Sequence, residues 1–172
     1  FLFLEIMDTG TGGANKMFAK GYNLESANQA DWTKLIDYYF QSETGIGALD
    51  ASVKEASAIL GPPRQKRQIV ISIPEPIVYQ HPEQASSSTK YWGKIDNQTL
   101  DFSNSADRIK ACKWYIDQVR AKFNEKNYQH VELAGFYWLA EKATDTRDIL
   151  NAVAIYLNKL KYSFNWIPYY GA

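Results

Sequence analysis

The sequence predicts an α/β fold in which four parallel strands alternate with helices. Four short apolar runs occupy residues 1–6, 68–74, 131–139 and 162–167. Segments whose apolar residues have helical spacing separate these runs. Strands that are apolar on both faces and joined by long helical crossovers are typical of a parallel sheet covered by helices. The pattern is therefore a βαβαβαβ segment.

The first half of the chain supplies one strand and two helices. The opening run, FLFLEI, is followed by a glycine-rich loop over residues 8–13. Asp31 is the predicted N-cap of a helix that begins with Trp32 on its apolar face. A TGIG interruption at residues 44–47 ends that helix, and a second one runs to the Gly-Pro-Pro sequence at 61–63.

The second half supplies three strands and two helices. The QIVISIP run at residues 68–74 is rich in β-branched residues, which favours a strand. A long loop over 75–104 precedes the clearest helix, for which Ser105 is the predicted cap. The third strand covers 131–139, and Asp145 is the predicted cap of the last helix before the fourth strand.

The composition argues against several classes of protein. The 172 residues carry 19 basic and 19 acidic side chains, so bulk charge does not predict nucleic-acid binding. No run of about 18 apolar residues predicts a membrane span. The single Cys112 excludes an intramolecular disulfide and a cysteine-rich zinc site. The pair His81 and Glu83 is too small a set to predict a metal, so neither metal nor cofactor is expected.

The two ends predict a piece of a longer protein. The chain begins at Phe1 directly in a strand-like run, without a methionine or a basic leader, and stops shortly after another such run. We therefore expect one partial domain over residues 1–172, with flanking segments missing on both sides.

Acidic and aromatic residues follow the strands at their carboxyl ends, where parallel α/β folds build their sites. The predicted site residues are Glu5, Glu75, Trp138, Glu141, Tyr169 and Tyr170. Rings among carboxylates suit a carbohydrate, because sugar C–H faces stack on rings while acidic groups hold hydroxyls. A doubly wound sheet and part of a (β/α)8 TIM-type barrel both fit the pattern. The TGTGG loop lacks a P-loop lysine, and the site composition favours the barrel.

The sequence resembles a bacterial family known as domain of unknown function 4855. The stretches that carry the resemblance are FLFLE, DWTKLIDYYF, LDFSNSADRIKACKWYIDQV, ELAGFYWLAE and FNWIPYYGA. The resemblance implies a barrel related to glycoside hydrolases, in secreted or cell-surface proteins, periplasmic ones included, of bacteria such as the Bacteroides group. It also implies that Glu141 follows the fourth barrel strand, where related glycosidases carry the acid/base glutamate. The second carboxylate would lie beyond Ala172.

Glu141 is thus the candidate general acid/base of a glycoside hydrolase, because its aromatic neighbours Tyr137 and Trp138 would raise its pKa. Glu5, Glu75, Trp138, Tyr169 and Tyr170 are the candidate substrate-binding residues. The alternative for Glu141 is a solvated charge that leads into the next helix or pairs with a nearby basic residue. The alternative for the protein is a non-catalytic carbohydrate-binding or cell-surface protein on the same fold.

Overall fold

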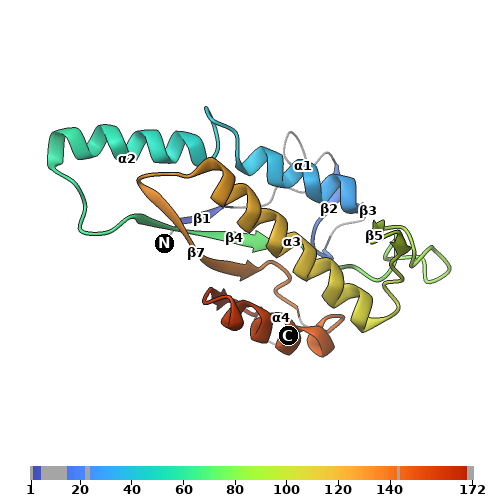
Figure 1. Ribbon diagram of the computed structural model, residues 1–172. Coiled ribbons are helices and arrows are strands. Elements are labelled where there is room, and N and C mark those ends of the chain that lie inside the picture. Colours follow the sequence, from blue (N-terminus) through green and yellow to red (C-terminus); the bar gives the residue numbers. More distant parts are fainter. Residues whose placement is uncertain (1, 5–14, 22–23, 143, 170–172) are drawn as a thin grey trace.

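A parallel sheet forms the centre of the protein. The computed structural model describes residues 2–4, 15–21, 24–142 and 144–169. Four strands pair in parallel and follow one another in chain order, namely β1 (Leu2–Leu4), β4 (Arg67–Ile73), β7 (Val131–Trp138) and β8 (Ser163–Asn165). The predicted parallel α/β architecture is confirmed (Figure 1). Within the described residues the sheet is open and does not close into a barrel.

Within the described parts of the chain, four helices connect the strands of this sheet. They are α1 (Gln29–Tyr39), α2 (Ile46–Leu60), α3 (Ser105–Lys126) and α4 (Arg147–Lys159). The long α3 crosses the sheet, with α1 on one side of it and α4 on the other, whereas α2 projects away from the body of the molecule (Figure 1). The main core lies between the sheet and α1, α3 and α4.

The starts of the helices differ from the predicted caps. Asn28, not Asp31, caps α1. The two residues form a capping box, in which each side-chain oxygen accepts a hydrogen bond from the other residue's backbone N–H at 3.1 Å. Asn104, not Ser105, caps α3 through its side chain. Asp145 does not cap α4, because its carboxylate pairs with a lysine elsewhere in the chain.

The long segment over residues 75–104 is more ordered than the predicted loop. It contains a small hairpin of β5 (Lys94–Ile95) and β6 (Gln98–Thr99). The two turn residues, Asp96 and Asn97, both have positive φ angles, as a two-residue type I′ turn requires. A further short parallel pair joins β2 (Lys16–Met17) to β3 (Glu25–Ser26).

The same segment also contributes large aromatic side chains to the core. Trp92 is fully buried, and its ring centroid lies 5.2 Å from that of Trp32 in α1. The Trp92 centroid also lies 5.5 Å from that of Trp114 in α3. Phe102 packs against Trp92 at 5.6 Å. Trp92 and Phe102 therefore anchor this segment in the core, whereas residues 81–90 between its buried parts are mostly exposed.

Gly135 allows β7 and β8 to approach closely. It pairs with Ser163 in the sheet register, just after an irregularity in the pairing of β4 with β7. A Cβ atom at position 135 would overlap Ser163 Oγ and lie 2.6 Å from the Ser163 carbonyl oxygen. Only glycine fits this position without a shift of the neighbouring strand.

Candidate functional site

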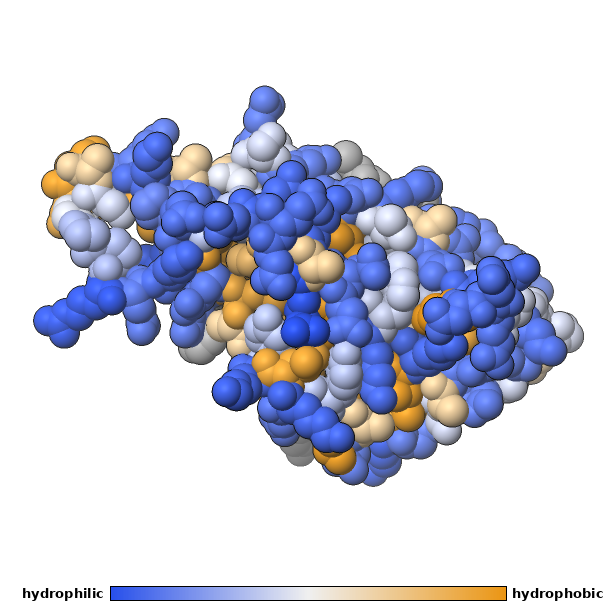
Figure 2. Space-filling view, viewed as in Figure 1, coloured by the Kyte–Doolittle hydropathy of each residue, from blue (hydrophilic) through white to orange (hydrophobic). Residues whose placement is uncertain are grey.

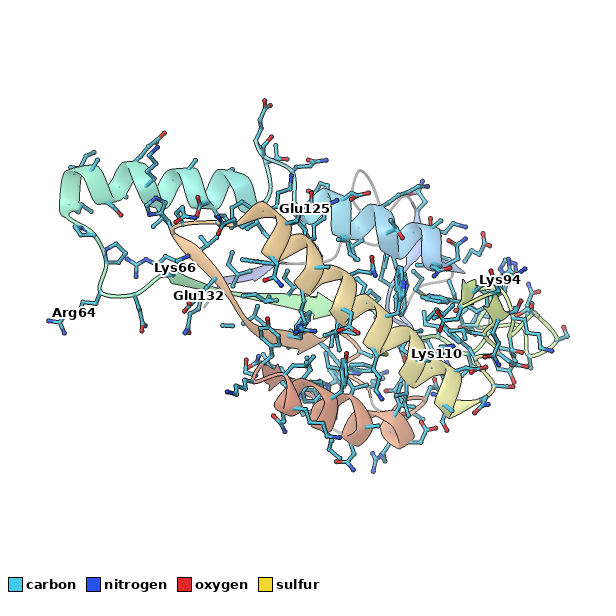
Figure 3. The ribbon with its side chains drawn as sticks, in the orientation of Figure 1. Arg64, Lys66, Lys94, Lys110, Glu125 and Glu132 are labelled. Atoms are coloured by element: carbon cyan, nitrogen blue, oxygen red, sulfur yellow. The ribbon has the colours of Figure 1, made fainter. Side chains whose placement is uncertain are left out.

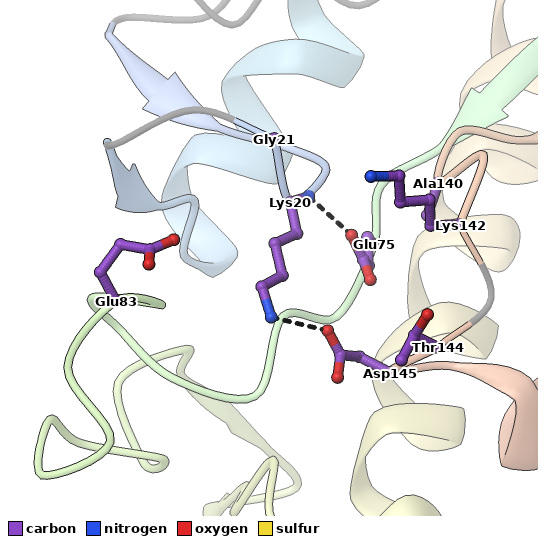
Figure 4. A pocket seen from close by; sticks show the side chains of 8 residues that line it. All are labelled: Lys20, Gly21, Glu75, Glu83, Ala140, Lys142, Thr144 and Asp145. Carbon is purple, nitrogen blue, oxygen red and sulfur yellow. Dashed lines mark hydrogen bonds and ion pairs between the residues drawn. The ribbon is translucent and has the colours of Figure 1, made fainter. Parts of the chain in front are cut away.

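A polar pocket of about 350 Å³ lies at the carboxyl-end edge of β4 and β7 (Figure 4). Segments that are distant in sequence build it, and its lining comprises Lys20, Gly21, Glu75, Glu83, Ala140, Lys142, Thr144 and Asp145. Because the carboxyl ends of parallel strands share one edge, this is where a site is expected in such a fold. The pocket therefore agrees with the predicted location, although most of its residues were not predicted.

Glu75 is the buried acid of this pocket. It lies two residues beyond β4, and its side chain is buried, with the residue only 4% exposed. Its backbone N–H donates to the carbonyl of Phe18 at 2.7 Å, and its Oε2 accepts from the backbone N–H of Lys20 at 2.7 Å. Loss of water around the carboxyl raises its pKa to about 7, an effect that the hydrogen bond from Lys20 only partly opposes. Glu75 thus retains a proton close to neutral pH.

An ion pair spans the mouth of the pocket. Lys20 Nζ lies 2.8 Å from Asp145 Oδ2, and both side chains are about half exposed (Figure 4). The hydrogen bond to Asp145 raises the pKa of Lys20. The negative charge of Asp145 also adds to the rise in the pKa of Glu75. Because exposed ion pairs are weak, a ligand with hydroxyl groups can compete for both partners.

Arg108 holds the segment that carries Asp145. The residue is only 6% exposed, and its Nη1 donates to the Asp145 carbonyl at 2.7 Å. Its Nη2 pairs with Asp148 Oδ2 at 2.7 Å. The sequence analysis missed this residue. The sequence feature that could have identified Arg108 is its position on the apolar stripe of α3, four residues before Cys112. A charge buried there needs a partner.

Glu141 does not line this pocket, although its neighbours Ala140 and Lys142 do. Its side chain is exposed, and its charge contributes, after burial, to raising the pKa of Tyr137. The Glu141 carbonyl accepts a hydrogen bond from the backbone N–H of Tyr169 at 3.0 Å. The structure thus brings Glu141 together with Tyr169, and it groups Glu75 with Lys20 and Asp145 instead.

The aromatic site residues have different environments. Tyr169 is 58% exposed, and Lys142 Nζ lies 5.6 Å from the centroid of its ring. Trp138, in contrast, is fully buried and packs with Phe164 in the core. It is therefore not a surface platform in this arrangement, because its side chain belongs to the hydrophobic core. Glu5 and Tyr170 lie outside the described residues.

The described residues give no sign of a metal centre. No three histidine, cysteine, aspartate or glutamate side chains within that part of the chain are grouped to hold an ion. Cys112 is buried in α3, and burial raises the pKa of its thiol. Among the same residues, no helix combines the length and apolar character needed to cross a membrane.

Comparison with known proteins places the chain in a family. No curated protein and no solved structure matches it. One family model matches residues 1–172, which is the whole chain, and this confirms the resemblance inferred from its strands and long helix. The chain belongs to the family described as domain of unknown function (DUF4855).

Proposed function

We propose that the protein is carbohydrate-active and resembles glycoside hydrolases, with Glu75 as the proton donor of its site. The observation that supports this proposal is the environment of Glu75, a buried carboxyl in a pocket at the carboxyl edge of a parallel sheet. Its pKa of about 7 suits a general acid, which must carry a proton at the working pH. The parallel strands in chain order, with helical crossovers, also support the proposal that they belong to a (β/α)8 barrel.

The pocket offers further groups for such a reaction. Asp145 and Glu83 line it with Glu75, so it can place a second carboxylate near a bound glycosidic bond. Lys20 and Lys142 can donate hydrogen bonds to sugar hydroxyls. The exposed ring of Tyr169 provides a stacking face close to Glu141. Glu141 remains our second proposed proton donor, on the grounds of the family resemblance. On the same grounds we propose that the protein is secreted or located at the cell surface.

The leaving group of the substrate distinguishes these roles. The protein and its Glu75→Gln, Glu141→Gln and Glu125→Gln variants would be assayed on glycans and on aryl glycosides. Loss of a general acid should lower kcat/KM by about 10²–10⁴-fold for poor leaving groups and far less for dinitrophenyl glycosides, which need no protonation. The exposed Glu125 in α3 serves as the control. Equal activity of the Glu75 and Glu125 variants on all substrates would refute the assignment to Glu75.

A non-catalytic carbohydrate-binding role is the second candidate. The exposed Tyr169 ring beside Lys142 favours it, because a surface platform binds a sugar without needing an acid. Calorimetry with oligosaccharides would then detect binding without turnover. Tyr169→Ala should weaken that binding at least tenfold, whereas Glu75→Gln should leave it unchanged. Turnover that depends on Glu75 would exclude this candidate.

A further inference from the structure

The helix α2 presents a second concave surface at the far side of the molecule. A groove of about 490 Å³ lies between one face of α2 and residues 61–67, which lead back to β4. The helix face contributes Leu49, Val53 and Leu60, which lie in one row along α2 because of their spacing. The volume is within the range of about 300–1,000 Å³ typical of ligand pockets.

This helix has unusually little packing of its own. Ile46 is its only buried residue, although α2 is 15 residues long. Leu60 and Ile59, at its end, are 83% and 84% exposed. Figure 2 shows hydrophobic surface at this outer end of α2. Helices of about this length are marginal in water without tertiary contacts, so the exposed apolar row is suited to packing against another element.

The charge of the groove defines what fits it. Arg64 and Arg67 line it, and no carboxylate does among the described residues that form its wall. Neither guanidinium forms an ion pair within the described chain, and Arg64 points away from the body in Figure 3. Asp50 of the same helix is occupied elsewhere, since it accepts hydrogen bonds from the backbone of residues 130 and 131.

We propose that this groove docks an amphipathic helix of a partner protein, whose apolar face is flanked by aspartate or glutamate. The row on α2 offers the i, i+4 spacing into which a second helix packs its own apolar residues. The two free arginines then meet acidic side chains along the edge of that helix, which gives orientation and a salt-dependent association. The proposal is independent of the polar pocket that contains Glu75, which lies at the opposite, carboxyl-end edge of the sheet.

The test uses a fluorescent synthetic helix of about 16 residues as the probe. It carries leucine on one face and glutamate beside it, and it is compared with a peptide in which lysine replaces glutamate and with a scrambled peptide. Fluorescence anisotropy should show that the acidic helix binds and that the lysine and scrambled peptides do not. The dissociation constant of the acidic helix should rise with salt concentration. Absence of binding, or equal binding of the lysine peptide, would overturn the proposal.

Matched variants localise the binding to the groove. Leu60→Ser should weaken the affinity at least about tenfold, because it removes an aliphatic side chain that the bound helix would bury. Ile59→Ser removes an equally exposed residue outside the groove and should leave the affinity within about twofold. The double change of Arg64 and Arg67 to glutamine should weaken binding of the acidic helix and reduce its dependence on salt. The control Lys94→Gln, at an exposed residue of β5, should change neither the affinity nor the salt dependence.

Two other outcomes would assign this surface differently and overturn the proposal. The first is co-sedimentation of the protein with vesicles of phosphatidylcholine and phosphatidylserine. If Leu60→Ser and Ile59→Ser reduce this vesicle binding equally, the end of α2 is a membrane contact. Sedimentation velocity that shows a dimer abolished by Leu60→Ser would make the groove an interface between two copies of the chain.

Discussion

Replacing Glu75 by glutamine should change how the stability of the protein depends on pH. The ordinary pKa of this carboxyl is 4.5, and burial raises it to about 7 in the folded protein. The folded state therefore holds the proton more tightly than the unfolded state. The stability from this group is greatest below pH 4.5, falls as the pH rises to about 7, and stays level above that. At about 1.36 kcal/mol per pKa unit, the fall is about 3 kcal/mol.

Glutamine retains a side-chain oxygen for the Lys20 N–H but has no proton to release. The variant should therefore not show the fall in the free energy of unfolding between pH 4.5 and about 7. Above pH 7 it should be more stable than the wild type by up to about 3 kcal/mol. Urea unfolding followed by tryptophan fluorescence, at several pH values between 4.5 and 8.5, measures the difference. The Glu125→Gln control should parallel the wild type, because Glu125 is exposed. Identical pH profiles for wild type and Glu75→Gln would refute the burial argument.

Three further substitutions or probes test the fold. Gly135→Ala should lower the free energy of unfolding by about 1–3 kcal/mol through overlap with Ser163, whereas Gly21→Ala, which has open space around its Cβ position, should cost far less in the same urea titration. Asn28→Ala should cost about 1 kcal/mol by removing the capping box of α1, and a normal unfolding midpoint would contradict that assignment. The thiol of Cys112 should react with Ellman's reagent only as fast as the protein unfolds; rapid labelling of the native protein would show that the thiol is accessible.

The sheet was predictable because its signal is local. The runs predicted at 68–74 and 131–139 agree with β4 and β7 to within one residue at each end. Their apolar, β-branched composition needs no knowledge of distant contacts. The caps were less predictable. Asn28 lies three residues before Asp31, and both suit an N-cap, so only the backbone geometry decides between them.

The site was harder to predict because burial depends on distant segments. Glu75 was predicted as a site residue from its place after a strand. Its perturbed pKa, however, arises from burial beside residues 18–20 and beside Ala140, Lys142, Thr144 and Asp145, which are distant in sequence. No periodicity in the sequence brings Lys20 to Asp145, which are 125 positions apart. Glu141 was predicted as the acid/base from its place after the strand, from the family resemblance and from its aromatic neighbours. The structure buries Trp138 in the core and exposes the side chain of Glu141.

The contacts of Trp92 make the protein its own optical reporter. Its ring meets those of Trp32 and Trp114 nearly edge to face, at interplanar angles of 77° and 85°. Indoles at such short separations couple their excited states, so circular dichroism in the aromatic region should carry a strong signal from this trio. Because Trp92 and Glu75 belong to the same segment, a displacement of that segment would change this signal even while the helices stay folded.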